Sequence, residues 1–293
     1  MLFIDDHFPS SVNRAIREVQ VNPFQRNNVS QHGDGNIAMV FAHGFGCDKN
    51  MWRFVWPAFE SQFRIVLFDH VGAGRSDTSE FESRKYASLE RYADDVLEIC
   101  AGIDAENIIF VGHSVSATIG ALASIKAPDL LSRLVMVAPS PCFINDRDYV
   151  GGFDRDTMDR LLDFLDENFE AWASAIAPTV MGNLDRPELG AELTQSFCRM
   201  EPEIAKHFAR LTFNSDHRSD FAKVEIPTLV MQCSQDAIAP DAVGLYVQQC
   251  IKGSHFVQLK ATGHCPNMSA PDETIHAIRK FLNEETYRLR LQA

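Results

Sequence analysis

Short apolar runs rich in β-branched residues alternate with longer stretches of helical period along most of this chain. This alternation limits the fold more than any other feature. The runs are almost continuously apolar, as strands of a parallel sheet covered on both faces are. Six are expected to be strands: Ile37–Ala42, Arg64–Phe68, Asn107–Val111, Leu134–Val137, Thr228–Met231 and Phe256–Leu259. The chain is therefore predicted to be an α/β protein, with one mostly parallel sheet, right-handed crossovers and helices on both faces.

The alternation stops between residues 139 and 220, where helical segments follow one another without a strand. Four are expected: Arg155–Asn168, Glu170–Met181, Arg186–Arg199 and Glu201–Phe213. A helical block inserted into an α/β chain is typical of a lid over the carboxyl edge of the sheet, where such folds bind ligands. The predicted division is an N-terminal extension (1–23, with a short helix around Ser11–Gln20), a core (24–138 and 221–293) and a four-helix lid (139–220).

Charge and cysteine content exclude several kinds of partner and site. The 293 residues include 27 Lys and Arg against 40 Asp and Glu, a net charge of −13. This balance argues against nucleic acid or an anionic membrane surface as a partner, because both are bound through basic side chains. The seven cysteines form no C-x-x-C pair, and no H-E-x-x-H is present, so we expect reduced thiols, a cytoplasmic location and no metal site. The sequence contains no apolar stretch of about 18 residues, so no membrane-spanning helix is expected.

The strongest single signal is a serine between a predicted strand and a predicted helix. Ser114 stands in Gly112-His-Ser-Val-Ser116, directly before the helical run Ala117–Lys126. A serine on such a sharp turn presents its hydroxyl away from the backbone, provided that small residues two positions away let the chain pass. Ser116 replaces the second glycine of the usual G-x-S-x-G pattern, and some crowding is expected there. Taken alone, the pattern also arises by chance in strand-to-helix turns.

A nucleophilic serine needs a base and an orienting carboxylate, which in this arrangement follow in the order Ser, Asp, His. Asp236 follows the strand Thr228–Met231, and His264 follows the strand Phe256–Leu259. Both positions lie at the carboxyl ends of strands, on the same edge as Ser114. Asp236 alone could cap a helix, and His264 alone could be a loop histidine. The three together predict a catalytic triad in which His264 takes the Ser114 proton and Asp236 orients the imidazole.

Two backbone amides are candidates for an oxyanion hole. His43-Gly-Phe-Gly46 follows the first core strand, and its two glycines let an amide face inward. The amides of Phe45 and Val115 would then bind the oxyanion of a tetrahedral intermediate; the alternative is a plain glycine-rich turn. The segment Gly72-Ala-Gly-Arg-Ser-Asp77 is not a dinucleotide-binding motif, since G-x-G-x-x-G requires glycine at its last position, where Asp77 stands. No cofactor is expected.

Taken together, His43-Gly-Phe-Gly46, Gly112-His-Ser114, Asp236 and His264 resemble the α/β-hydrolase superfamily. More closely, segments such as Phe41-Ala-His-Gly-Phe-Gly-Cys-Asp48 and Gly263-His-Cys-Pro266 resemble the RsbQ-like group of bacterial stress-response regulators, to which plant strigolactone and karrikin receptors are related. The resemblance covers residues 26–282. It implies an α/β-hydrolase fold with a V-shaped lid of four helices over the triad. It also implies slow hydrolysis coupled to a signalling partner, such as a PAS-domain phosphatase.

The lid sequence limits the substrate. Its large apolar side chains mostly pack the lid on the core, and a minority line the cavity; the expected pocket residues are His113, Phe153, Trp172 and Ile176. Such a site suits a small, uncharged, apolar ester or lactone. We therefore predict a serine hydrolase of esterase or lactonase type. The alternative is a ligand-sensing regulator that hydrolyses slowly and docks a signalling protein through its lid.

Overall fold

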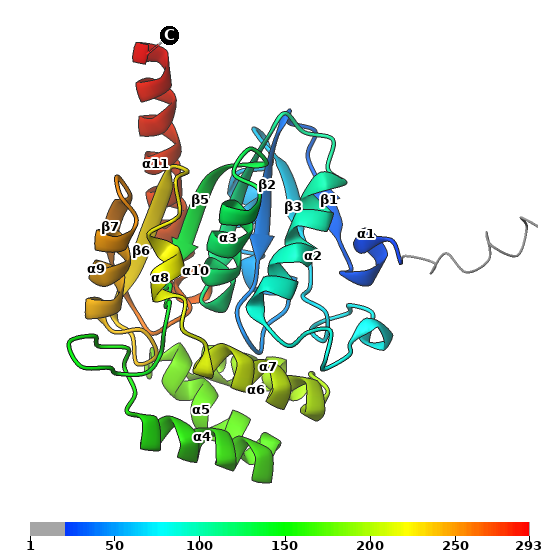
Figure 1. The fold of residues 1–293 in the computed structure, drawn as a ribbon, viewed down its shortest axis with the longest axis vertical. Coiled ribbons are helices and arrows are strands. Elements are labelled where there is room, and N and C mark those ends of the chain that lie inside the picture. Colours follow the sequence, from blue (N-terminus) through cyan, green and yellow to red (C-terminus); the bar gives the residue numbers. More distant parts are fainter. Residues whose placement is uncertain (1–20, 293) are drawn as a thin grey trace, which may run out of the picture.

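The computed structural model describes residues 21–292, with side chains described as far as Glu284. This part of the chain contains one seven-stranded sheet in the order β1-β3-β2-β4-β5-β6-β7 (Figure 1). All neighbours pair in parallel except β1, which runs antiparallel to β3 at the edge. The strands are β1 (Ser30–His32), β2 (Ile37–Ala42), β3 (Arg64–Leu67), β4 (Asn107–His113), β5 (Leu131–Val137), β6 (Thr228–Gln235) and β7 (His255–Thr262). The α/β prediction is confirmed; β1 was missed because three polar residues carry no apolar period.

Both faces of the sheet are covered, because successive residues of the central strands point to opposite sides. On β2, Met39 and Phe41 belong to one core cluster, while Ala38 and Val40 belong to the other. One face packs against α2 (Leu89–Ala101), α3 (Val115–Lys126) and α9 (Asp241–Cys250), with α8 (Arg218–Phe221) beside α3 and α9. The other packs against the 3₁₀ helix η1 (Lys49–Trp52), α10 (Pro266–Ser269) and α11 (Pro271–Gln292).

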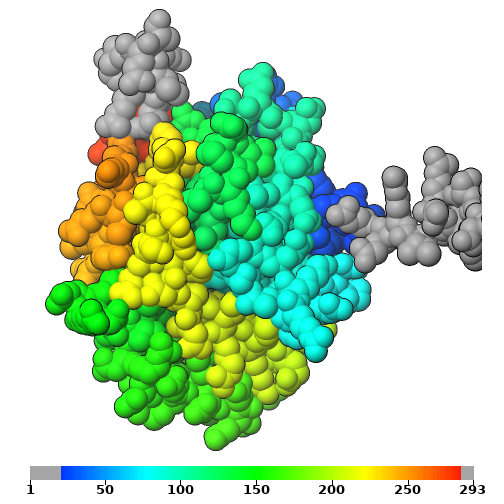
Figure 2. All heavy atoms as spheres, viewed as in Figure 1, coloured from blue at the N-terminus to red at the C-terminus, as the bar shows by residue number. Residues whose placement is uncertain are grey.

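Four helices lie together beyond the carboxyl ends of the strands (Figure 1). They are α4 (Arg155–Glu167), α5 (Phe169–Met181), α6 (Pro187–Cys198) and α7 (Pro202–Asn214). Pro187 and Pro202 each stand in the first helical turn, where a missing N–H costs nothing. Figure 2 shows these helices packed directly against the core. They therefore cover the edge at which β2, β4, β6 and β7 end.

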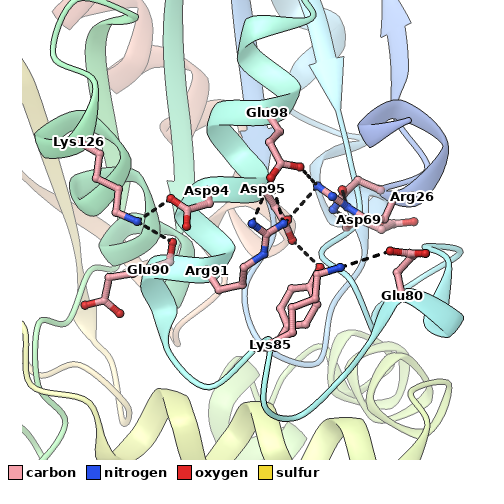
Figure 3. A network of polar contacts seen from close by, with 12 residues as sticks. Arg26, Asp69, Glu80, Lys85, Glu90, Arg91, Asp94, Asp95, Glu98 and Lys126 are labelled. Atoms are coloured by element: carbon pink, nitrogen blue, oxygen red, sulfur yellow. Dashed lines mark hydrogen bonds and ion pairs between the residues drawn. The ribbon is translucent and has the colours of Figure 1, made fainter. Parts of the chain in front are cut away.

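A buried ion network fixes the start of the described chain to the core. Arg26 of α1 (Pro23–Arg26) pairs with Asp95 at 2.8 Å and with Glu98 at 2.7 Å, both on α2. Arg91 of the same helix also contacts both carboxylates, as Figure 3 shows. Asp95 is completely buried and accepts a further hydrogen bond from the hydroxyl of Tyr86 at 2.9 Å. The pairing is what makes a buried carboxylate tolerable here.

The short helix expected around Ser11–Gln20 lies outside the described residues. Within 21–292, none of the helices combines the length and the apolar character that crossing a bilayer requires.

Candidate active site

Ser114 sits on the sharp turn between β4 and α3. Its backbone adopts φ 55° and ψ −122°, a sparsely populated conformation for a residue with a Cβ. The chain passes this turn only because Gly112 lacks a side chain: a Cβ there would lie 2.3 Å from the carbonyl oxygen of Ser116. This backbone conformation places the Ser114 side chain at the carboxyl edge of the sheet, beneath the lid.

Three side chains predicted from the sequence are joined by hydrogen bonds at this edge. The Oγ of Ser114 lies 2.7 Å from Nε2 of His264, and Nδ1 of His264 lies 2.7 Å from Oδ2 of Asp236. Ser114 follows β4, Asp236 follows β6 and His264 follows β7, so three strand ends converge on one point. All three residues are buried. The hydrogen-bond chain is therefore shielded from bulk water.

Asp236 is held as a carboxylate. Burial by itself would raise the pKa of this group, but the His264 imidazole and hydrogen bonds from His264, Ala239 and Ile238 outweigh it, so the pKa is lowered. The amides of Ile238 and Ala239 donate to Oδ1 at 2.8 and 3.0 Å, which leaves Oδ2 for His264. An ionised Asp236 accepts only, and so fixes the proton of neutral His264 on Nδ1 and leaves Nε2 free to accept from Ser114.

Ser116 does not merely crowd the turn; it joins three segments. Its Oγ donates to the backbone carbonyl of His43 at 2.5 Å and accepts from Nε2 of His70 at 2.7 Å. Ser116, His43 and His70 are all completely buried. Burial, together with repulsion from His43, lowers the pKa of His70 well below its usual range, so the ring is neutral. Ser116 thus ties helix α3 to the loops that follow β2 and β3.

His113 lies behind the triad and not on the cavity wall. Its Nε2 donates to the backbone carbonyl of His264 at 2.7 Å, and its ring packs 5.0 Å from the His264 ring. Burial, with repulsion from His264 second, lowers the pKa of His113 to about 3, so the ring is neutral near pH 7. His113 was expected among the pocket residues, but it is absent from the residues that line either cavity described below. It supports the loop that carries His264.

Phe45 and Val115, whose amides were the candidates for an oxyanion hole, both lie near Ser114: Phe45 lines the cavity that also contains Ser114, and Val115 directly follows Ser114 in the chain. Phe45 lies in the loop after β2, and Val115 is the first residue of α3. Within residues 21–292 neither N–H donates a backbone hydrogen bond, so both are available to a ligand oxygen. The Phe45 ring packs on lid residues Trp172, Phe197 and Phe213.

A small apolar cavity of about 40 Å³ adjoins Ser114 and His264. A second cavity of about 80 Å³ shares four of its lining residues, Trp172, Ile176, Phe213 and Ile238. Of the residues predicted to line the pocket, Trp172 and Ile176 line both cavities and Phe153 lines the second. Phe213, Ile238 and Thr212 line the first and were not predicted as pocket residues. A larger cleft, about 700 Å³, is polar and has none of the triad residues in its wall.

Comparison with known proteins identifies the family. Residues 39–277 match the model described as the alpha/beta hydrolase family. The chain belongs to this family. This α/β hydrolase is 37% identical to a strigolactone esterase of Arabidopsis thaliana (90% of this chain, 98% of the relative) and 36% identical to a karrikin insensitive 2 receptor of Petunia hybrida (89% and 97%). Among solved structures, a hydrolase from Oleispira antarctica matches with a TM-score of 0.87 and 42% identity, over 89% of this chain and 96% of that one.

The arrangement in this α/β hydrolase has the parts that acyl transfer requires. A serine hydroxyl is hydrogen-bonded to an imidazole, and the imidazole is hydrogen-bonded to a carboxylate. Among the described residues, the amides of Phe45 and Val115 donate no backbone hydrogen bond and could serve an oxyanion. His70 and Thr212 have no signature of their own in the sequence and were missed; Ser116 was noted as a replacement for glycine, but its hydrogen bonds were not predicted. Their significance comes from partners or cavities built by distant segments.

Proposed function

We propose that this protein is a carboxylic ester hydrolase that cleaves a small, apolar ester or lactone through Ser114, His264 and Asp236. The observation that carries the proposal is the unbroken hydrogen-bond chain from Ser114 to Asp236, with both distances at 2.7 Å, next to an apolar cavity under the lid. Family membership and the esterase relative support the same reaction class. Residues 24–138 and 221–293 would form the catalytic core, and 139–220 the lid that shapes the cavity.

In the proposed reaction Ser114 Oγ attacks the carbonyl carbon while His264 Nε2 takes its proton. Asp236 stabilises the resulting imidazolium, and the Phe45 and Val115 amides stabilise the oxyanion. His264 then returns the proton to the leaving alcohol, and water releases the acyl group from Ser114 by the reverse sequence. A serine at the elbow excludes the family chemistries that begin with an aspartate nucleophile.

A reactive fluorophosphonate probe tests the proposal directly. Wild-type protein should be labelled at Ser114 and should turn over p-nitrophenyl esters, whereas Ser114→Ala should lose labelling and lose activity by roughly 10³-fold or more. Ser124→Ala provides a matched control on the same helix, and should be labelled like wild type. Full activity in Ser114→Ala would contradict the assignment.

A second candidate function is ligand sensing with slow turnover. The relative named a karrikin receptor, 36% identical over 89% of this chain, favours it. In this proposal the lid binds a signalling protein, such as a PAS-domain phosphatase, after a small apolar ligand has been bound or cleaved. We also propose a cytoplasmic location, in line with seven free cysteines. A pull-down with wild type and with Ser114→Ala separates the candidates: rapid turnover of a metabolite with no captured partner would contradict sensing.

A further inference from the structure

Thr212 is a buried polar residue without a partner on the wall of the catalytic cavity. It lies on lid helix α7 and is only 1% exposed. Within the described residues its Oγ1 has no hydrogen-bond partner. A helical threonine commonly donates to the carbonyl one turn back, as Thr194 does to Gly190 at 3.0 Å. Thr212 does not, and instead contributes to the cavity that also holds Ser114 and His264.

Leaving this hydroxyl unpaired is unfavourable, because a buried donor without an acceptor loses its hydrogen bond to water. Among the described residues that line this wall, no side chain apart from Thr212 itself and the triad carries an acceptor oxygen: the others are Phe45, Trp172, Ile176, Val180, Phe197, Phe213 and Ile238. Trp172 carries the second unpartnered polar atom of this wall, its indole N–H. An indole N–H can only donate. A ligand group that satisfies this wall must therefore accept hydrogen bonds.

We propose that Thr212 determines substrate specificity by donating a hydrogen bond to an oxygen acceptor that the substrate carries apart from its scissile carbonyl. A ketone, an ether or a second ester carbonyl would serve. The inference rests on the proposed function and narrows it, from any small apolar ester to one with a second, uncharged oxygen. Val180 and Phe213 beside Thr212 leave the remainder of the substrate in apolar surroundings.

Two p-nitrophenyl esters of equal chain length, the pentanoate and the 4-oxopentanoate, test the inference. The measured quantity is the ratio of their kcat/KM values in each variant, corrected for spontaneous hydrolysis. Thr212→Val, which keeps the shape and removes the hydroxyl, should lower the oxo-to-alkyl ratio roughly 3- to 10-fold, the value of one neutral hydrogen bond. Thr212→Ser should restore most of it. Thr194→Val is the matched control, and should leave the ratio unchanged.

A purely structural hydroxyl would behave differently. If Thr212 served only the fold, Thr212→Val would lower the melting temperature and leave the ratio of the two kcat/KM values unchanged. Because the hydroxyl has no hydrogen-bond partner among the described residues, we expect no loss of stability. Ser114-dependent hydrolysis of both esters with an unchanged ratio in Thr212→Val would overturn the Thr212 proposal and leave the proposed function standing. If wild type hydrolyses neither ester in a Ser114-dependent way, the proposed function fails, and the Thr212 proposal fails with it.

Discussion

Replacing Ser116 with alanine removes the hydroxyl that joins the elbow helix to two neighbouring loops. The substitution deletes a donor to the His43 carbonyl at 2.5 Å and an acceptor for His70 Nε2 at 2.7 Å. Neither group can turn to solvent, since all three residues are completely buried. The carbonyl and the imidazole N–H would both be left unpaired.

Each unpaired buried group costs about 1–3 kcal/mol. A water molecule could enter the space vacated by Oγ and recover part of this, so we expect the free energy of unfolding to fall by about 2–4 kcal/mol. For a chain of this size that corresponds to a melting temperature lower by roughly 4–8 °C. Ser116→Gly, which restores the usual pattern of the turn, should be no more stable than Ser116→Ala, because glycine also lowers helix stability by up to about 1 kcal/mol.

Urea denaturation and ester turnover measure the two consequences. The matched control is Ser124→Ala on the same helix, whose buried hydroxyl donates only to the Ala121 carbonyl one turn back at 2.8 Å. We expect that control to lose less than about 1 kcal/mol. Since His43 begins the loop that carries Phe45, Ser116→Ala should also lower kcat about 10-fold or more, through a displaced amide.

The reasoning would be refuted by a Ser116→Ala protein that unfolds at the same urea concentration as Ser124→Ala and turns over ester at the wild-type rate. Such a result would mean that the hydroxyl is incidental and that the loop after β2 is held by other contacts.

Three further predictions concern charged residues. Asp236→Asn should lower kcat by roughly 10³- to 10⁴-fold, because the amide no longer fixes the His264 tautomer; a loss under 10-fold, measured on p-nitrophenyl butyrate, would contradict the role. The pKa of Asp236 is lowered in the folded protein, so its contribution to stability is present above about pH 4 and is lost as the pH falls further. The urea concentration at the unfolding midpoint should therefore fall less below pH 4 in Asp236→Asn than in wild type. Arg26→Ala should lower the free energy of unfolding in urea by about 3 kcal/mol, because buried Asp95 would lose one of its two arginine partners. Lys126→Ala, which breaks an exposed pair with Asp94, should lower it by less than about 1 kcal/mol. Equal losses in the two variants would argue against a stabilising role for the buried network.

Much of the fold could be predicted because its signals are local. Strands buried on both faces are continuous apolar runs, and the predicted Ile37–Ala42 coincides with β2. The four helices of the lid were predicted within a residue or two of their observed ends, since proline marks the start of α6 and of α7. Strand ends were less accurate: β6 continues to Gln235 and β7 to Thr262, because paired neighbours extend the ladder past the apolar run.

Some parts of the candidate site could likewise be predicted from local sequence signals, and others could not. Chain order and strand ends were enough to predict that Ser114, Asp236 and His264 would meet, because the carboxyl ends of parallel strands share one edge. The structural roles of Ser116 and His113 could not be predicted, because each depends on a hydrogen bond to a residue far away in the sequence. Ser116 bonds a residue 73 positions away and His113 one 151 positions away, and no sequence pattern marks either pair. His113 was expected among the pocket residues, but its Nε2 donates to the backbone carbonyl of His264, which holds its ring against the loop that carries His264.

The net charge of −13 says little about the substrate, because no charged side chain that contributes to it lines the two apolar cavities. Within the described part of the chain, the residues lining the two apolar cavities include no Asp, Glu, Lys or Arg. A charged substrate would give up its hydration there without gaining a counter-charge, which costs several kcal/mol. In the proposed mechanism, the one negative charge that develops next to these walls is the oxyanion formed when Ser114 attacks the carbonyl carbon. In that mechanism the Phe45 and Val115 amides and the His264 imidazolium would stabilise the oxyanion more strongly in these apolar surroundings than in water. Apolar walls that disfavour a charged substrate would therefore also favour binding of the transition state over the uncharged ground state in the proposed mechanism.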